Sequence, residues 1–559
     1  MSKNSTEHIK PKERAIRYYG YAQIASKLYK ASQNGKVFNN LSNLLITDDN
    51  IAQAYRSIKT NKGAKTKGSD GQNIINLSNI KLKRLQKLVE EATEHYTPKA
   101  VRRVMIPKKT PGEFRPLGIP TTFDKLIQQI IKQILEPILE AKFVTTSYGF
   151  RLARNQHQAI EHIQRLIAQG EYTHVVEFDI KKYFDNISHE ILLEILYREG
   201  IQDNKMLMLV KAILKAPVKG IGIPEKGTPQ GGVLSPLLAN TYLNELDKFI
   251  YSKFQDLEGK IKTYRKKYHT RPVHIVRFAD DFCVFTKSRK DAIYYMNQVI
   301  CFLRTQLKLE HSPEKTRITN MKKRAIKFLG IKIKAVKSKN QKIKHLVAKS
   351  YIPKESVKKL AKKAKSETAL KKRISIVRGA FNYWSIATGI SQASSLYNNL
   401  QHRKIKKKPK KKDLTQNPTQ NYVEVLNEGL NVKVKYRQTL LACQDSFLKN
   451  LEKLSDLNIN NWYKDRNDSI EKYDIIRSKY RAQQKKDPIT KEPLFRPHCH
   501  RIIPHTKGGK YIFTNCMLVN DWTHRIIHGT FDNLVRFCRV YKLKNKVIQK
   551  LAMLFKKAH

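Results

Sequence analysis

The sequence predicts a multidomain protein of the α+β class. Its 559 residues exceed what one hydrophobic core organises, so about three or four domains are expected. Apolar residues make up 40% of the chain, which is enough to form ordered cores. Short strand-forming runs are mixed with helical patterns up to about residue 335, and this order suits an α+β sheet better than a doubly wound one.

Changes in pattern divide the chain into five regions. A basic, mostly helical extension covers 1–95, and mixed strands and helices fill 96–340. A helical region follows over 341–402, and then a basic stretch of weak pattern over 403–470. A compact module that contains histidine and glycine closes the chain over 471–559. These regions are the domain organisation that we expect.

The chain is strongly basic. It has 109 Lys and Arg residues against 47 Asp and Glu residues, which gives a formal net charge of +62. Few folds tolerate such self-repulsion unless a polyanion neutralises it, so nucleic acid is the expected partner. The plain alternative is a solvated lysine-rich surface favoured by an AT-rich genome.

The densest positive charge lies between residues 403 and 412, where eight of ten side chains are basic. Such a run is either a solvated linker or a segment that contacts phosphates, and we favour contact with nucleic acid. Its basic members are Arg403, Lys404, Lys406, Lys407, Lys408, Lys410, Lys411 and Lys412.

Cysteine usage and hydropathy indicate the compartment. The six cysteines include no Cys-x-x-Cys pair, which speaks for a reducing environment and against a disulfide framework. The first residues, Met1–His8, open no apolar segment, so we expect neither a signal peptide nor a transit peptide. We also expect no membrane span, because no run of about 18 apolar residues occurs.

An Asp280-Asp281 pair lies between two strand-forming runs, 274–278 and 282–286, so it should occupy the tip of a β-hairpin. A further apolar run, 175–178, ends at Asp179 and would bring a third carboxylate beside that tip. Oxygen ligands suit Mg²⁺, and two such ions about 3.5–4 Å apart can clamp the oxygens of phosphoryl transfer. The arrangement is typical of a polymerase palm, although an isolated Asp-Asp doublet also suits an ordinary turn.

Other motifs surround these aspartates in a definite order. They are Ile-Pro-Lys-Lys at 106–109, Arg-Pro-Leu-Gly-Ile-Pro at 115–120, Ser-Tyr-Gly-Phe-Arg at 147–151, the run 178–187, the Pro-Gln-Gly-containing run 227–240, Glu-Lys-Thr at 314–316 and Phe-Leu-Gly at 328–330. In this order and spacing the motifs resemble the reverse transcriptases encoded by group II introns, also called intron maturases. The resemblance covers roughly residues 45–400 and departs from the family at Phe278, where most members have tyrosine.

The resemblance implies a right-hand polymerase with Mg²⁺ at its catalytic site. Fingers and palm would occupy 96–340, and the α-helical thumb, or maturase segment, would occupy 341–402. Asp179 and Asp280 would be the main Mg²⁺ ligands, and the backbone carbonyl of Ile180 a further one. Because successive strand residues point to opposite faces, Asp281 would bind more weakly or indirectly.

The resemblance also implies residues that bind the incoming dNTP. Phe184 corresponds to the steric gate that excludes a 2′-hydroxyl, with a core aromatic as the alternative role. Gln230 would contact the nucleotide. Lys108 and Arg115 would hold its triphosphate, since arginine suits bidentate phosphate contact, unless they are ordinary surface cations.

The implied partners are the group II intron RNA, whose splicing the protein would assist, and a target DNA. In such an element the RNA supplies the splicing chemistry, while the protein supplies charge neutralisation and shape recognition. The expected location is a bacterial cytoplasm or the interior of an organelle whose genome encodes the protein.

The last region resembles an HNH endonuclease domain, a ββα-metal fold. The similarity rests on the segment 498–509, then on Asn515, His524 and His528. Residues four apart share one helix face, so His524 and His528 would meet one ion, either Mg²⁺ or Zn²⁺. In the family the ion polarises the scissile phosphate, a histidine activates water, and the asparagine orients that histidine. Two ordinary core histidines are the alternative.

The match to the HNH pattern is imperfect. Counted from Pro504, His500 is a metal ligand and Arg501 takes the position of the base. Counted from Asn515, His500 is the base and Cys499 the ligand. Arginine stays protonated and is a poor base, so His505 or His498 would have to substitute.

The Cys-x-x-Cys pairs that often flank this domain are missing, and Asp487-Pro488-Ile489-Thr490 occupies one such place. One rival interpretation is therefore an RNA-binding maturase without a working nuclease. Another is a host-defence or otherwise domesticated reverse transcriptase.

Overall fold

The computed structural model describes residues 21–61, 63–107, 112–152, 154–255, 271–338, 345–367, 370–384, 386–387, 468–495, 497–540 and 545–558. These residues form two compact units. The first unit draws on Met1–Lys142, Leu193–Leu237 and Leu448–His559, and the second on Phe143–Leu192 and Leu238–Phe447. No helix within the described ranges is both long enough and apolar enough to cross a membrane.

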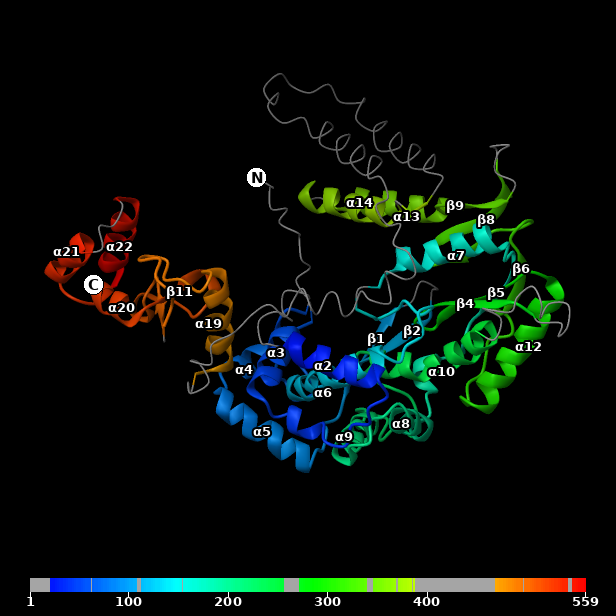
Figure 1. The fold of residues 1–559 in the computed structure, drawn as a ribbon, viewed down its shortest axis with the longest axis horizontal. Helices are drawn as coiled ribbons and strands as arrows, with labels where there is room; N and C mark the ends of the chain where they lie inside the picture. Colours follow the sequence, from blue (N-terminus) through cyan, green and yellow to red (C-terminus); the bar gives the residue numbers. More distant parts are fainter. Residues whose placement is uncertain are drawn as a thin grey trace, which may run out of the picture. The chain divides into compact units, whose positions relative to one another are not determined.

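The first unit begins with a layer of helices packed around α6 (Figure 1). These are α2 (Tyr21–Gln33), α3 (Asp48–Lys59), α4 (Ile74–Ser78), α5 (Leu82–Glu94) and α6 (Thr122–Glu140). Apolar side chains recur along α6 at helical spacing and are buried, including Leu126, Ile130 and Ile134. Both α2 and α3 pack on this helix. The short η1 (Ser42–Leu44) connects them.

The first unit also holds the antiparallel hairpin of β1 (Arg102–Pro107) and β2 (Phe114–Ile119). The helix α9 (Asn204–Leu214) belongs to the first unit as well. The helices α8 (His189–Arg198) and α10 (Ser235–Gln255) each contain residues of both units. The backbone N–H of Gly118 in β2 donates to the carbonyl of Gln230 at 2.6 Å. This bond ties the hairpin to the loop that precedes α10.

A four-stranded antiparallel sheet forms the centre of the second unit (Figure 1). Its strand order is β4-β5-β3-β6, with β3 His174–Phe178, β4 Val273–Phe278, β5 Asp281–Thr286 and β6 Arg317–Asn320. The helix α12 (Arg289–Thr305) packs on β5, β3 and β6, and α7 (Gln156–Gly170) packs on β4. Val175, Val276 and Phe285 are fully buried, as expected for strands covered by helices.

A second sheet extends the same core. It consists of β7 (Ile326–Phe328), β8 (Ile331–Lys337) and β9 (Leu346–Tyr351), followed by α13 (Lys354–Ser366) and α14 (Leu370–Trp384). Side chains from α7, both sheets and the two helices make one hydrophobic cluster. The region 341–402 was predicted to be helical, and this was wrong for its first described part, because 346–351 forms the strand β9 paired with β8. The basic run 403–412 lies outside the described residues.

The closing module of the first unit has an antiparallel strand pair and a helix. β10 (His498–Arg501) pairs with β11 (Cys516–Val519), and α20 (Asp521–Ile527) follows directly. The short η3 (His505–Lys507) and η4 (Phe513–Asn515) lie between the strands, and α21 (Phe531–Val540) and α22 (Asn545–Ala558) close the chain. Ile489, Met517, Ile527 and Leu551 are among the residues of its core.

The helix α19 (Ile470–Ala482) attaches this module to the N-terminal helices within the first unit. Arg56 on α3 donates to Asp474 at 2.7 Å, and Arg477 donates to Asp49 at 2.8 Å. On the module side, Gln483 exchanges two hydrogen bonds with the backbone of Leu518 at 2.7 and 2.9 Å. The module is thus fixed to α3 through two ion pairs, and the partners in each pair lie more than 400 residues apart in sequence.

Candidate functional site

The strand register of the four-stranded sheet determines where the three predicted aspartates lie. Phe178 of β3 pairs with Phe282 of β5, so Asp179 and Asp281 are the next residues along the two strands. Phe278 pairs with Asp281 across the β4–β5 hairpin, which leaves Ala279 and Asp280 as its two-residue turn. The three carboxylates therefore come from one end of the sheet.

Asp179 is held by residues of the loop before β6. Its Oδ2 atom accepts hydrogen bonds from Ser312 Oγ at 2.8 Å and from Lys315 Nζ at 3.1 Å, and its backbone carbonyl accepts from Ser312 N at 2.8 Å. The carboxylate remains 44% exposed and so is open to a ligand. The motif 314–316 marked this loop in the sequence, but the roles of Ser312 and Lys315 were not predicted.

The carboxylates at this end of the sheet influence one another. Loss of water contact, together with the charges of Asp280, Asp179 and Glu177, raises the pKa of Asp281 to about 6. Glu177 is itself neutralised by Arg317, whose Nε donates to it at 2.9 Å. Crowded carboxylates of this kind favour a divalent cation.

Phe184 and Ile180 follow Asp179 in the same unit. Phe184 lies in the short η2 (Tyr183–Asp185) and is partly exposed, whereas Tyr183 beside it is buried and donates its hydroxyl to the carbonyl of Ala239 at 2.5 Å. Partial exposure leaves one part of the Phe184 ring available to a ligand. The Ile180 side chain is buried, and its backbone makes an isolated bridge with His311.

Arg115 and Gln230, two of the predicted nucleotide-binding residues, meet in the first unit. Arg115 Nε donates to Gln230 Oε1 at 2.8 Å. The loop turns sharply at Gly231, whose φ is +117° and whose added Cβ would lie 2.4 Å from the carbonyl of Gly118, so only glycine fits there. Lys108, the other predicted triphosphate ligand, lies outside the described residues.

Three histidines form a compact group in the closing module. One ring nitrogen from each of His500, His524 and His528 lies within 4.8 Å of the others. Burial, followed by the charges of His528 and His524, lowers the pKa of His500 to about 4. Burial, followed by the charges of His498 and His528, lowers the pKa of His524 to about 4. The rings of His500 and His524 are therefore neutral at physiological pH, as metal ligation requires.

The donor set of this group fits a metal ion. His500 Nε2 is buried without a hydrogen-bond partner, which is costly unless something else binds it. Three imidazoles suit Zn²⁺ better than Mg²⁺, which prefers oxygen. His498 lies beside the group: its Nε2 is 2.8 Å from Asp521 Oδ1, and its ring stacks on His524 with centroids 4.7 Å apart.

The remaining predicted residues of the module have other contacts. Asn515 accepts from the N–H of Ile503 at 2.8 Å and donates to the carbonyls of Ile503 and Lys510, so its amide holds the intervening loop. The guanidinium of Arg501 lies over the Tyr511 ring at 4.4 Å. Cys499 packs in a separate small cluster with Leu518. None of these contacts joins them to the three histidines.

Asp487 fixes the start of α20. It is fully buried, and its carboxylate accepts from the backbone N–H of Ile489 and Asn520, both at 2.8 Å, and from Thr523 Oγ1 at 2.9 Å. Two of these donors lie at the beginning of α20, which carries His524. Asp487 thus occupies a place where related domains often have a Cys-x-x-Cys pair, and its hydrogen bonds join this loop to the start of α20.

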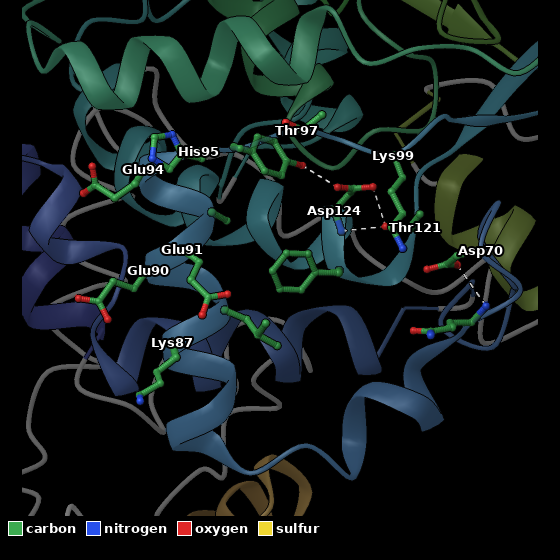
Figure 2. Close-up of a pocket in the computed structure, with 15 residues that line it drawn as sticks. Asp70, Lys87, Glu90, Glu91, Glu94, His95, Thr97, Lys99, Thr121 and Asp124 are labelled. Atoms are coloured by element: carbon green, nitrogen blue, oxygen red, sulfur yellow. Dashed lines mark hydrogen bonds between the residues drawn. The ribbon is translucent and has the colours of Figure 1, made fainter.

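A pocket of about 790 Å³ lies beside α5 in the first unit (Figure 2). Five carboxylates line it: Asp70, Glu90, Glu91, Glu94 and Asp124. Asp124 is buried and accepts from Tyr96 at 2.8 Å, and burial raises its pKa. None of the predicted site residues lines this pocket.

Comparison with known proteins identifies the matching family. The family described as Reverse transcriptase (RNA-dependent DNA polymerase) matches residues 106–333. The Group II intron-encoded protein LtrA of Lactococcus lactis subsp. cremoris is 36% identical over 361 residues, covering 56% of this chain and 59% of that protein. Protein YkfC of Escherichia coli (strain K12) is 33% identical over 318 residues, covering 52% of this chain and 82% of that protein.

These matches cover only part of each chain. The chain spans 59% of the length of LtrA, and the match to the reverse transcriptase family ends before the histidine module. A solved telomerase from Candida albicans aligns with a TM-score of 0.34 at 14% identity, over 68% of this chain and 71% of that one, a likeness too slight to support an argument. With most of YkfC covered, the chain belongs to the reverse transcriptase family, together with proteins that group II introns encode.

Proposed function

We propose that the protein is an RNA-directed DNA polymerase that copies RNA into cDNA from dNTPs. The observation that carries this proposal is the meeting of Asp179, Asp280 and Asp281 at one end of the four-stranded sheet. The matched family range, 106–333, contains all three. Burial, followed by the charges of its acidic neighbours, raises the pKa of Asp281, and a bound cation would relieve the repulsion among these carboxylates.

In this proposal Asp179 and Asp280 are the main Mg²⁺ ligands. Asp281 contributes more weakly, and the carbonyl of Ile180 is a further ligand. When bound, Mg²⁺ supplies positive charge for the attacking and leaving oxygens of phosphoryl transfer. Lys315, whose Nζ donates to Asp179 Oδ2 at 3.1 Å, orients that carboxylate.

The nucleotide contacts follow from the same proposal. Phe184 would lie under the sugar of the incoming dNTP, where its ring collides with a 2′-hydroxyl. Gln230, hydrogen-bonded to Arg115, would contact the nucleotide, and Arg115 would turn its guanidinium to the triphosphate. Lys108 would join it from the segment between β1 and β2.

We also propose that the protein binds a structured group II intron RNA and assists its splicing. The net charge of +62 and the relationship to LtrA support this role. Helices α13 and α14 would contact the RNA, and the basic run 403–412 would add phosphate contacts. The RNA itself would supply the splicing chemistry.

For the closing module we propose a metal-dependent DNA endonuclease of the HNH kind, which would cut target DNA and provide a primer for cDNA synthesis. His500, His524 and His528 would hold the ion, which would polarise the scissile phosphate. His498, oriented by Asp521, would activate the attacking water in place of Arg501. Asn515 would act by holding the loop 503–510.

A specific observation favours one rival for this module. The amide of Asn515 binds backbone groups, and Arg501 lies over Tyr511, so neither residue contacts the histidines as the HNH pattern implies. A module without cleavage activity, serving only to bind DNA, is therefore the second candidate. Target-DNA cleavage by the wild type is compared with cleavage by a variant that carries His524→Ala and His528→Ala. Cleavage that is lost in the variant supports the endonuclease, and cleavage that is unchanged supports a module that only binds DNA.

Primer extension tests the polymerase proposal. Purified protein is given an RNA template, an annealed DNA primer, dNTPs and Mg²⁺, and cDNA is measured for the wild type, Asp280→Ala and a control, Glu190→Ala. Loss of a metal ligand worth several kcal/mol should lower the rate by about a thousandfold in Asp280→Ala. RNA binding should be unchanged, and the exposed Glu190 should be dispensable. Undiminished synthesis by Asp280→Ala would refute the proposal.

A further inference from the structure

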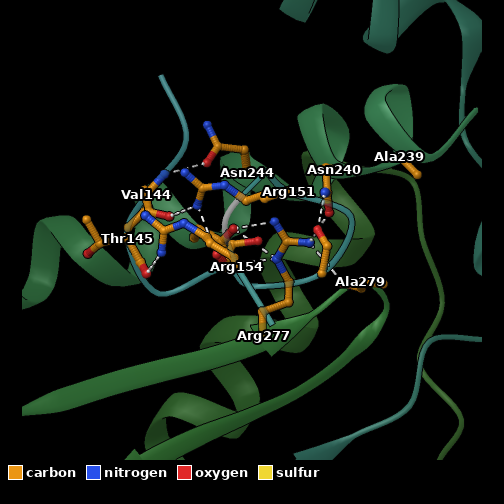
Figure 3. A network of polar contacts seen from close by, with 12 residues as sticks. Val144, Thr145, Arg151, Arg154, Ala239, Asn240, Asn244, Arg277 and Ala279 are labelled. Atoms are coloured by element: carbon orange, nitrogen blue, oxygen red, sulfur yellow. Dashed lines mark hydrogen bonds and ion pairs between the residues drawn. The ribbon is translucent and has the colours of Figure 1, made fainter. Parts of the chain in front are cut away.

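A fully buried ion pair lies next to the turn that carries Asp280. Arg277, near the end of β4, and Asp247, on α10, have side chains only 1% and 0% exposed. Figure 3 shows Arg277 beside Ala279 and Asn240. Arg277 Nε lies 3.0 and 2.9 Å from the two carboxylate oxygens, and Nη2 lies 2.6 Å from Oδ2. Burying two charges costs so much desolvation that the pair adds little net stability. Its position beside the turn that carries Asp280 therefore points to a role beyond stability.

The remaining guanidinium nitrogen of Arg277 reaches the turn itself. Nη1 donates to the carbonyl of Ala279 at 2.9 Å and to Asn240 Oδ1 at 3.0 Å. Ala279 has a φ of +60°, a left-handed conformation that costs a non-glycine residue about 1–2 kcal/mol. The hydrogen bond from Arg277 helps to hold this strained residue, and Asp280 is the next residue along the chain.

The backbone of Gly149 packs against the same turn. An added Cβ there would lie 2.4 Å from the backbone nitrogen of Ala279, so the two backbones are in direct contact. Asn240 Nδ2 donates to the carbonyl of Gly149 at 2.6 Å. Arg151 and Arg154 donate to carbonyls of residues 144, 145 and 147 and so order this segment internally (Figure 3). The N–H of Tyr148 donates to the carbonyl of Arg277 at 2.9 Å and joins the segment to β4. The turn is thus fixed between Gly149 and Arg277.

The same part of α10 also holds the segment that carries Phe184. Tyr183 donates its hydroxyl to the carbonyl of Ala239, the residue before Asn240. The first turns of α10 therefore bind both to the residues around the Asp280 turn and to Tyr183, the residue before Phe184. A shift of this helix end would move the metal-binding turn and the sugar-contacting ring together.

We propose that Arg277, oriented by Asp247 and Asn240, is a positioning residue that fixes Asp280 for metal binding. This inference rests on the proposed polymerase function. Arg277 touches neither metal nor nucleotide in this account and acts only through the Ala279 carbonyl. A purely structural ion pair would change stability and leave metal affinity unchanged.

The test removes both charges together, because removing one leaves the other buried and unpaired. Arg277→Met with Asp247→Leu fills the same space without the bond to Ala279. The matched control is Tyr242→Phe, which deletes another buried hydrogen bond of α10, 2.6 Å to the carbonyl of Leu307, away from the turn. Gly149→Ala is a second variant that keeps the ion pair and pushes on Ala279.

Two readouts are measured for each folded variant: Mn²⁺ affinity by electron paramagnetic resonance, and cDNA synthesis against Mg²⁺ concentration. All proteins carry His524→Ala and His528→Ala, so that only the polymerase site is reported. The double variant and Gly149→Ala should weaken Mn²⁺ binding several-fold and lower kcat by about tenfold to a hundredfold, since misplacement by about 1 Å has effects of that size. Tyr242→Phe should change only the thermal midpoint.

Wild-type Mn²⁺ affinity in the folded double variant overturns the inference. If the double variant does not fold, Arg277→Lys decides instead, because it keeps a positive charge opposite Asp247 but loses the guanidinium nitrogen that reaches the Ala279 carbonyl. Wild-type Mn²⁺ affinity in Arg277→Lys then overturns the inference. Failure of the wild type to make cDNA overturns the polymerase function instead, and the Mn²⁺ measurement still decides whether Arg277 positions Asp280. The two failures are therefore distinguishable.

Discussion

Phe178 and Phe282 stack across β3 and β5, with ring centroids 5.0 Å apart and planes inclined by 14°. Asp179 follows the first ring and Asp281 precedes the second, so this pair fixes which carboxylates share the end of the sheet. A one-residue slip in register would turn every side chain of the strand to the other face. Apolar packing in the core therefore determines the geometry of the charged site.

Substitution of Phe184 should change nucleotide selection. Phe184→Ala removes the ring that we propose to lie under the sugar, so rNTPs should be incorporated much more readily relative to dNTPs. Primer extension with each nucleotide class measures the ratio of kcat/KM values. Phe184→Tyr keeps the ring and should remain selective. Unaltered selectivity in Phe184→Ala would mean that the ring is only a core aromatic.

Removal of two histidines should abolish metal binding by the closing module. His524→Ala with His528→Ala leaves His500 as the last member of the group, so the purified protein should lose about one Zn²⁺ per chain, measured by elemental analysis. Cleavage of the target DNA strand should disappear as well. The exposed His505 supplies the control, His505→Ala. Cleavage that survives the double substitution would leave the module as a DNA-binding piece.

Stability should fall in mild acid because two histidines are buried in neutral form. Burial, then the charges of His274, Arg165 and Arg154, lowers the pKa of His162 to about 3. Burial, then Lys287, lowers the pKa of His274 to about 4. The unfolded chain takes up these protons near pH 6.5, so the unfolded state gains protons first as the pH decreases.

Each histidine should therefore reduce the free energy of unfolding by at most about 1.4 kcal/mol per pH unit between pH 6.5 and about 4, and should have no effect above pH 6.5. Urea midpoints at pH 7.5 and 5 measure this. His274→Gln should show a smaller drop than the wild type. An equal drop in both proteins would contradict the assignment.

Neutralisation of the basic run 403–412 should weaken nucleic-acid binding and reduce its dependence on salt. For each phosphate that the protein no longer neutralises, the slope of log K against log salt concentration should become shallower by about 0.7 to 0.9. Replacing the lysines of the run by glutamine and titrating RNA at several salt concentrations gives this slope. A slope equal to that of the wild type would identify the run as a solvated linker.

The local features of the sheet were predictable from sequence because their signals are local. Strand-forming runs on both sides of Asp280-Asp281 predicted the β4–β5 hairpin, and the structure has strands at 273–278 and 281–286, with Asp281 as the first residue of β5 and not in the turn. Arg115 and Gln230, each predicted separately to bind the nucleotide, are in contact, although nothing in the spacing required it. The reverse transcriptase family was likewise predicted and is confirmed.

Long-range polar contacts were not predictable, because no periodicity relates their partners. Arg277 and Asp247 lie 30 residues apart, and Arg56 and Asp474 lie 418 apart. Each pair depends on tertiary packing of elements whose sequences predict only helix or strand. The contact of His498 with Asp521 also depends on tertiary packing. The sequence left both His498 and His505 as possible general bases, and this contact is the reason why we propose His498.

Direct measurement of metal binding tests the central claim, that Asp179, Asp280 and Asp281 together hold divalent cations. Mn²⁺ substitutes for Mg²⁺ at carboxylate sites and is detected by electron paramagnetic resonance. In protein carrying His524→Ala and His528→Ala, we expect bound Mn²⁺ that is lost in Asp179→Asn and in Asp280→Asn, with Glu190→Gln as the unaffected control. Mn²⁺ binding that is unchanged in both aspartate variants would contradict it.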